Sequence, residues 1–252
     1  MTLRHITAIY FNGHAEAAKK RVQRLKAAGY LNQRSRRVNE PAIYHISKKA
    51  FEVLRQQQTL DGYPQLSWPA HEKRFRISHL TLRHELEVMD VKAAFVTAAT
   101  KTPRIEIAEF STWPAMYQFK SRRLSSDGFG RENILVKPDG YIRIKYVREG
   151  NPMEHRLFLE VDRSTETLVT LLRRIICYHD YYRSGGLAKR YGFPHSQYKR
   201  VPFRVLAVFR TTDRLRNVEE QLLLLRPPMR NFVWLATFDA IVRDPMAMTT
   251  PS

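Results

Sequence analysis

Apolar and polar positions in the first 57 residues follow a helical period, then a strand period, then a helical period again. Residues 14–31 place apolar side chains about one helical turn apart, which predicts a helix ending near a glycine. That apolar stripe consists of Ala18, Val22 and Leu25. Strand-like segments at 30–33 and 42–46 enclose a polar loop, and residues 47–58 return to helical spacing. We therefore predict a helix, a hairpin and a second helix.

The second half of the chain alternates between long helical patterns and short apolar strands. Its helices are predicted over 77–100, 165–183 and 214–225, and its strands over 104–110, 134–147, 155–163, 203–212 and 232–238. The 203–212 segment is almost continuously apolar, as expected for a strand covered on both faces. This order predicts an α/β domain built on a mixed sheet with flanking helices.

The segment between these two patterns has no clean periodicity. Residues 58–78 contain two prolines and a glycine, a composition typical of a linker. The sequence is therefore predicted to divide into a first domain at 1–57, a linker at 58–78 and a second domain at 79–252.

The net charge of the chain points to a polyanionic partner. Lys and Arg number 43 against 24 Asp and Glu, a formal net charge of +19, and such an excess favours nucleic acid. The single cysteine, Cys177, excludes an intramolecular disulfide and a thiolate-rich zinc site. No apolar run approaches the roughly 20 residues that cross a bilayer, and no segment resembles a signal peptide. We expect a cytoplasmic protein with no membrane partner.

The first 57 residues have the order and charge of a winged helix-turn-helix. They carry 12 basic residues against 3 acidic ones. In that fold a recognition helix enters the major groove and the wing loop contacts phosphates. The predicted DNA-binding residues are Lys19, Lys20, Gln23 and Arg24 on the helix and Arg34, Arg36 and Arg37 in the wing loop. A winged helix that binds protein instead of DNA is the main alternative.

Two carboxylates end the predicted strand at 155–163. Because strand side chains alternate, Glu160 and Asp162 share one face and lie about 7 Å apart. Asp139 lies in a Pro-Asp-Gly turn of the preceding strand, which predicts a strand break there. If the two strands pair, Asp139 approaches Glu160. Converging carboxylates suit Mg²⁺ or Mn²⁺, and a metal on a basic protein fits phosphodiester chemistry.

An ion-pair interpretation of the same carboxylates is equally open. Each acid can pair with a neighbouring arginine, and the candidates in the adjacent sequence are Arg143, Arg156 and Arg163. The acids would then stabilise the fold and hold no metal.

Several segments together resemble the replication-relaxation family of plasmids and integrative elements. They are "RVQRLKAAGYL", "YHISKKAFEVL", "HELEVMDVKAAF", "PDGYIRI", "LFLEVDRSTETLVTLLRRIICYHDYYRSG" and "FRVLAVFRTTDRLRNV", and "FLEVDRSTE" is the most specific of them. The resemblance covers nearly the whole chain. It implies a DNA-binding protein that acts in replication, relaxation or mobilisation, with replication or mobilisation proteins and a second copy of the chain as further partners.

The second domain also resembles the PD-(D/E)xK nuclease fold. The resemblance implies that Asp139 and Glu160 are the two metal-binding acids and that Glu85, on the first helix, joins them. Asp162 stands where that fold carries a lysine, and Arg163 or Arg174 would have to supply the missing cation. Arginine does not act as a base at ordinary pH. The resemblance therefore implies either a Mg²⁺- or Mn²⁺-dependent endonuclease with catalytic Asp139, Glu160, Asp162 and Glu85, or an inactive relative.

Three functions follow from these patterns. The first is a DNA-binding protein of a mobile element that nicks DNA with a metal. The second is an inactive accessory protein that binds DNA and recruits a partner. The third is a transcriptional regulator with a ligand-sensing second domain.

Residues 182–200, with five cations and three glycines, are predicted to be a mobile segment that faces DNA.

Overall fold

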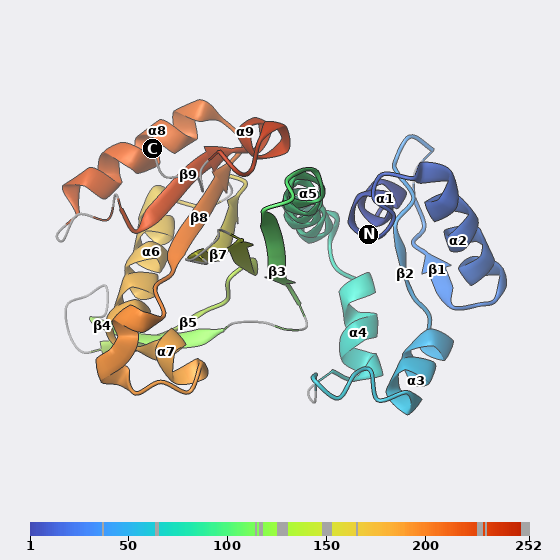
Figure 1. Ribbon diagram of the computed structural model, residues 1–252, viewed down its shortest axis with the longest axis horizontal. Helices are drawn as coiled ribbons and strands as arrows, with labels where there is room; N and C mark the ends of the chain where they lie inside the picture. Colours follow the sequence, from blue (N-terminus) through green and yellow to red (C-terminus); the bar gives the residue numbers. More distant parts are fainter. Residues whose placement is uncertain are drawn as a thin grey trace. The chain divides into compact units, whose positions relative to one another are not determined.

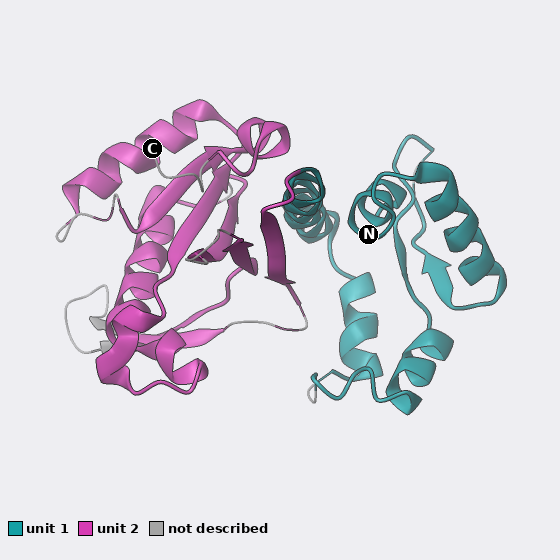
Figure 2. Ribbon diagram, in the orientation of Figure 1, with its two compact units in different colours: residues 1–101 teal, residues 102–252 magenta. Residues whose placement is uncertain are grey.

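The computed structural model describes residues 1–247 except 37, 64–65, 114, 116–117, 125–130, 148–152, 165, 226–228 and 230. The chain forms two compact units, Met1–Lys101 and Thr102–Ser252 (Figures 1 and 2). We call them unit 1 and unit 2. None of the helices in the described part of the chain combines the length and apolar character that a membrane crossing requires.

Unit 1 is a small helical unit that contains one hairpin. Its elements are α1 (Leu3–Tyr10), α2 (Ala15–Ala27), β1 (Leu31–Gln33), β2 (Tyr44–Ile46), α3 (Lys48–Gln56), α4 (Trp68–Phe75) and α5 (His79–Lys101). The structure confirms the predicted helix, hairpin and helix as α2, β1–β2 and α3. Ala18 and Val22 of the predicted stripe are buried, and Gly29 follows α2 with a φ of +74°, the left-handed conformation that suits a residue just past a helix.

The short helix α1 is absent from the predicted elements, although it organises unit 1. The Thr2 side chain accepts a hydrogen bond from the backbone N–H of His5 and so caps the helix. Thr2 also forms an isolated antiparallel bridge with Ile43, which adds a short third segment to the hairpin. His5 Nε2 lies 2.7 Å from an Asp90 carboxylate oxygen, which ties α1 to α5. Eight residues carry too little periodicity for the sequence to reveal such a helix.

The division between the units lies at a different place from the predicted linker. Residues 58–78 contain the helix α4, whose first turn is capped by Ser67. Arg34 donates hydrogen bonds to the carbonyls of Phe75 and Ile77, at 2.9 Å each. These contacts hold the predicted linker inside unit 1, and α5 packs against α1 in the same unit. The chain divides between Lys101 and Thr102, so the first helix of the predicted second domain belongs to unit 1.

Unit 2 is an α/β unit built on a mixed five-stranded sheet. The strands of that sheet are β3 (Ile105–Ser111), β6 (Gly140–Tyr146), β7 (Met153–Asp162), β8 (Arg204–Phe209) and β9 (Val233–Thr237), in that spatial order. The pairs β3–β6 and β6–β7 are antiparallel, whereas β7–β8 and β8–β9 are parallel. This result confirms the predicted mixed sheet with flanking helices.

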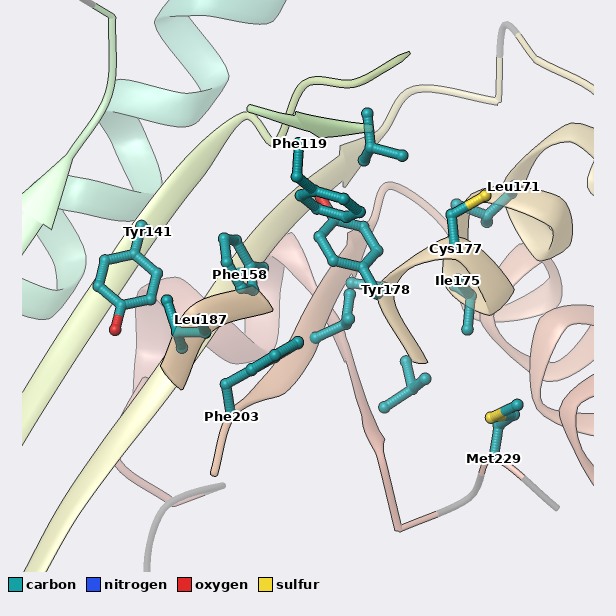
Figure 3. Close-up of a cluster of buried hydrophobic side chains, with 14 of the residues drawn as sticks. Phe119, Tyr141, Phe158, Leu171, Ile175, Cys177, Tyr178, Leu187, Phe203 and Met229 are labelled. Atoms are coloured by element: carbon teal, nitrogen blue, oxygen red, sulfur yellow. The ribbon is translucent and has the colours of Figure 1, made fainter. Parts of the chain in front are cut away.

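Two crossover helices lie on one face of the sheet. The helix α6 (Leu168–Arg183) connects β7 to β8, and α8 (Thr212–Leu224) connects β8 to β9. Right-handed crossovers that advance in the same direction place their helices on the same face. Figure 3 shows the resulting core, in which Phe158 of the sheet packs beside Tyr178 of α6 with ring centroids 5.2 Å apart. The opposite face of the five-stranded sheet is also buried, because Ile142, Leu159 and Leu206 are inaccessible to solvent.

The segment predicted as one strand over 134–147 is two strands. The first, β5 (Arg131–Val136), pairs with β4 (Phe119–Leu124) in a separate two-stranded sheet, and the second is β6. The break falls at Pro138 and Asp139, where the sequence predicted it. Phe119 of the additional hairpin stacks on Tyr181 of α6 with a centroid distance of 4.0 Å. The hairpin therefore extends the core beyond the predicted elements.

Residues 182–200, which the sequence predicted to be a mobile segment, contain two short helices. They form α7 (Gly186–Arg190) and a 3₁₀ helix, η1 (His195–Arg200), that pack against each other. Leu187 and Ala188 are buried in the main core. A last helix, α9 (Phe238–Arg243), follows β9. Two of the three glycines, Gly185 and Gly186, permit close packing against His195 and Tyr181.

We predict that Gly186→Ala destabilises the protein. A methyl group at this position would lie 1.9 Å from the Tyr181 ring, and that ring is held in place by its stack on Phe119. Overpacking of this kind costs about 1–3 kcal/mol. Thermal or urea unfolding of the variant measures the loss. The control is Gly62→Ala, where nothing lies within 4 Å of the added methyl group. Equal stability of the two variants would contradict the packing described here.

Candidate functional site

The carboxylates at the end of β7 lie together on the face of the sheet that carries α6 and α8. Register places Glu160 opposite Ala207 and Asp162 opposite Phe209 of β8. Glu160 contacts α6 and Asp162 contacts α8, so the predicted alternation along the strand holds. Both residues are almost completely buried, with relative exposures of 2% and 3%. Two buried carboxylates require partners that compensate for their lost hydration.

Asp139 joins these carboxylates from the neighbouring strand. Its backbone N–H donates to the carbonyl of Leu159 at 3.0 Å, and its Oδ2 accepts a hydrogen bond from the Val161 N–H at 2.7 Å. The side chain thereby spans the point where the β6–β7 ladder ends. Its charge contributes to the raised pKa of Glu160. The structure thus brings Asp139 and Glu160 to a common point, as the strand pairing predicted.

Glu160 is held by one arginine and one tyrosine of α6. Arg174 donates to its Oε2 at 2.6 Å, and the Tyr178 hydroxyl donates a short hydrogen bond to its Oε1. Burial raises the pKa of Glu160 to about 7, because desolvation outweighs the attraction of Arg174. Burial and the nearby Glu160 also raise the pKa of Tyr178 well above its ordinary value. Tyr178 therefore stays protonated and acts as a donor.

Asp162 and Glu166 are held by a second set of contacts that joins α6 and α8. Arg214, at the start of α8, donates from Nε to Asp162 Oδ2 at 2.7 Å and from a terminal nitrogen to the Glu166 carbonyl at 3.0 Å. The Ser164 N–H donates to the other oxygen of Asp162 at 2.8 Å. The second terminal nitrogen of Arg174 donates to the Glu166 carboxylate at 2.6 Å. We call Asp139, Glu160, Asp162, Glu166, Arg174 and Arg214, with Tyr178, the carboxylate–arginine cluster.

The cluster follows the ion-pair interpretation, with other arginines than those predicted. Arg143 and Arg156 pair with Glu154, near the start of β7. Tyr178, Glu166 and Arg214 were not predicted as members. Arg214 could have been predicted from the sequence, because the carboxyl ends of neighbouring parallel strands meet at one edge of the sheet. Asp162 ends β7, and Arg214 follows the end of β8 by five residues.

The carboxylate oxygens that a divalent metal ion would use at Glu160 and Asp162 are occupied by protein donors. Both oxygens of Glu160 and both oxygens of Asp162 already accept hydrogen bonds. A cation at Glu160 would have to displace Arg174, whose positive charge occupies that position. Among the residues that the structure describes, no three or more His, Cys, Asp or Glu side chains are arranged to hold a metal. Binding of Mg²⁺ or Mn²⁺ by Asp139 and Glu160 stays a prediction.

Glu85 has its own partner in unit 1. It lies on α5, and its carboxylate forms an ion pair with Arg74 of α4. This contact links two consecutive helices of the same unit. The structure accordingly gives Glu85 a local role in packing α4 against α5, whereas its predicted role as a fourth site acid stays a prediction.

The predicted recognition helix is present and carries its cations on the surface. Lys19, Lys20, Gln23 and Arg24 are all exposed on α2, while Ala18 and Val22 of the same helix are buried. Basic and polar side chains on the exposed face of a helix are free to meet phosphates or base edges.

The wing cations are less uniform than the sequence suggested. Arg34 is half-buried, and its guanidinium is occupied by the carbonyls of Phe75 and Ile77, so it holds α4 to the hairpin. Arg36 is exposed and donates to the Glu40 carbonyl within the loop. Arg37 lies outside the described residues. Of the two described wing arginines, Arg36 alone keeps an exposed side chain that suits DNA contact.

The fold and the cluster define the class of the protein. It is a strongly basic, two-unit protein whose second unit is a mixed-sheet α/β unit with buried acids at the end of its central strand. A model of the replication-relaxation family matches residues 1–196, more than half of the chain, and the chain belongs to that family. The match includes Asp139, Glu160 and Arg174, whereas Arg214 lies beyond it. No curated protein and no solved structure matches the chain significantly.

We predict that Arg174→Met destabilises the protein strongly. The variant removes the counter-charge of Glu160, and breaking a buried ion pair from one side costs about 3–5 kcal/mol. The folded-state pKa of Glu160 already lies above its ordinary value of 4.5. Below its folded-state pKa of about 7, Glu160 is largely protonated in the natural protein and in the variant. The loss is therefore smallest below about pH 7 and grows above it, because ionised Glu160 then lacks compensation. Unfolding by urea at several pH values measures it.

Two controls accompany this variant. Arg173→Met changes the neighbouring, exposed arginine of α6 and should alter the free energy of unfolding by less than about 0.5 kcal/mol. Adding Glu160→Gln to Arg174→Met should restore part of the stability, because glutamine carries no charge. A double variant less stable than Arg174→Met alone would show that Arg174 does not act through Glu160.

Proposed function

We propose that this protein is a DNA-binding accessory protein acting in the replication or relaxation of a mobile genetic element, with a nuclease-like second unit that does not cleave DNA. Family membership supports the process. The charge of +19 supports a nucleic-acid partner. In this proposal unit 1 binds DNA. The buried acids of unit 2 stabilise its fold, and the surface of unit 2 recruits a partner protein of the replication machinery.

The arrangement of unit 1 supports a winged helix. In order, the chain forms the bridging segment at Thr2, then α1, a turn at Asn12 and Gly13, α2, β1, a loop, and β2. This order is that of a helix-turn-helix followed by a wing, in which α2 is the recognition helix. α5 packs against α1 and supplies a third helix beside α1 and α2.

The strand order of unit 2 supports a nuclease-like fold. The sheet has sequential order, and its second strand, β6, is antiparallel to its neighbours. Asp139 stands immediately before β6 and Glu160 lies in the third strand, β7, which are the positions that the resemblance to PD-(D/E)xK nucleases implies.

The observation that carries the non-catalytic assignment is the pairing of the acids with arginine. Arg174 forms an ion pair with Glu160 at a nitrogen–oxygen distance of 2.6 Å, and Arg214 forms one with Asp162 at 2.7 Å. Among the described residues, no lysine makes a hydrogen bond or an ion pair with either acid. Arginine stays protonated at ordinary pH and does not activate a water molecule. Two arginines that offset the charges of Glu160 and Asp162 stabilise the junction of β7, α6 and α8, and in this proposal DNA contact belongs to other surfaces.

We predict that reversing three charges on α2 weakens DNA binding. The variant is Lys19→Glu, Lys20→Glu and Arg24→Glu, and binding to a short duplex is measured over a series of salt concentrations. Each lost phosphate contact reduces the slope of log K against log salt by about 0.9. The control reverses three other exposed cations of unit 1, namely Arg55, Lys73 and Arg83. Equal affinities for the two variants would overturn the recognition-helix assignment.

We further predict that the purified protein does not nick supercoiled plasmid in Mg²⁺ or Mn²⁺. Arg174 and Arg214 occupy the positions that a metal would need at Glu160 and Asp162, so plasmid topology should match that of a protein-free sample on an agarose gel. Asp139→Ala is the matched control and should behave identically. Nicking by the natural protein that Asp139→Ala abolishes would show that the metal-dependent endonuclease is the correct function.

A further inference from the structure

The two short helices after α6 carry a group of exposed cations in unit 2. Arg183 ends α6, Lys189 and Arg190 lie on α7, and Lys199 and Arg200 lie on η1, and all five are exposed. We call this group the α7–η1 surface. From Tyr181 to Thr212 the sequence contains seven Lys or Arg residues and no Asp or Glu. The positive charge of this surface is therefore not neutralised by acids of its own segment.

The α7–η1 surface is held in place by glycine-dependent packing. Gly185 has a φ of +68°, and a methyl group there would lie 2.8 Å from the His195 Cα. This close approach fixes the start of α7 against η1. Leu187 and Ala188 anchor α7 in the core, and the Arg200 guanidinium lies 5.2 Å from the Phe193 ring centroid. The cations therefore project from a rigid base, which limits the conformational entropy lost on binding.

The aromatic rings beneath these cations are already occupied. The Tyr191 hydroxyl lies 3.1 Å from the Tyr141 hydroxyl, and the Tyr198 ring packs edge-on against Tyr182 with a centroid distance of 5.1 Å. A guanidinium also covers one face of the Tyr191 ring and one face of the Phe193 ring, with centroid distances of 5.5 Å to Arg156 and 5.2 Å to Arg200. These contacts reduce the ring surface for base stacking, the interaction that single-stranded nucleic acid requires. The groups that the α7–η1 surface exposes are consequently the charged ends of lysine and arginine side chains, which bind phosphate.

The α7–η1 surface lacks the apolar centre of a protein interface. Protein interfaces have a buried core enriched in aromatic and apolar residues. The large hydrophobic side chains that are exposed in the described part of the chain all lie outside residues 181–212. A phosphate backbone, which is negatively charged and needs no apolar contact, fits this surface better than an acidic protein does.

We infer that the α7–η1 surface is a second DNA-binding site, which contacts the phosphate backbone of duplex DNA without reading its sequence. The inference rests on the proposed function in that it takes DNA as the partner, but it places a contact on unit 2 that is separate from α2 and from the carboxylate–arginine cluster. DNA binding by this protein would then depend on both units.

The test reverses two charges of the surface in the full-length protein. Binding of Lys189→Glu with Lys199→Glu to a duplex of about 40 base pairs is measured over a series of salt concentrations. We expect the slope of log K against log salt to fall by about 2, since each phosphate contact contributes about 0.9, and the affinity to fall on the order of tenfold. Two duplexes of unrelated sequence should be affected equally, because phosphate contacts carry no sequence information.

The matched control changes the net charge of unit 2 by the same amount elsewhere. Arg216→Glu with Arg243→Glu reverses exposed arginines of α8 and α9, where Glu219, Glu220, Asp239 and Asp244 already reduce the local charge. This control should leave the slope nearly unchanged. If the two double variants bind alike, the α7–η1 surface is not a DNA contact and the inference is overturned. Should the glutamate variant unfold at a lower temperature than the natural protein, Lys189→Gln with Lys199→Gln answers the same question.

The outcome separates this inference from the proposed function. If α2 does not bind DNA, reversing its charges leaves the affinity unchanged while the α7–η1 variant still loses affinity. If the α7–η1 surface does not bind DNA, the reverse pattern appears. If both hold, the combined variant should have the smallest salt slope of all.

Discussion

The burial of two carboxylates at the end of one strand is the constraint on which unit 2 depends. Glu160 and Asp162 lie at 2% and 3% exposure, a position that an ionised acid tolerates only with a charged or strongly donating partner. Arg174 reaches Glu160 from α6, and Arg214 reaches Asp162 from α8. The two crossover helices are thereby joined to the central strand through the same group of side chains.

This arrangement shows how a basic protein can bury acids at one place, with an arginine beside Glu160 and another beside Asp162. Acids at the carboxyl end of a central strand, beside Asp139, are a familiar setting for phosphodiester cleavage. Here the arginines provide within the protein the positive charge that a metal would otherwise supply. Removing one partner would leave an uncompensated buried charge. The free-energy cost of that charge keeps the remaining ion pairs of the cluster in place. The interaction partners that the proposal requires must then come from exposed surfaces.

The two units present their positive charge in different ways. In unit 1 the cations predicted to contact DNA lie mainly on the exposed side of one helix, α2, with Ala18 and Val22 buried behind them. In unit 2 they lie on short helices that glycine packing fixes to the core, at Gly185 and Gly186. The same residue type thus suggested flexibility in the sequence and rigidity in the structure, because a glycine permits both a loose loop and a close contact. Neighbouring residues such as Tyr181 decide between them.

The sequence by itself determined the order of the main helices and strands, the mixed sheet, the break at Pro138 and Asp139, and the approach of Asp139 to Glu160, but not the short helices or the β4–β5 hairpin. These features follow from local periodicity and from strand alternation, which short segments express on their own. The tertiary structure decided the rest. It placed the division of the chain after Lys101, because Arg34 binds α4 and α1 packs on α5. It also brought Arg174 to Glu160 and Arg214 to Asp162. Arg214 lies 52 residues from Asp162, and only the folded arrangement of β7, β8 and α8 brings their charges together.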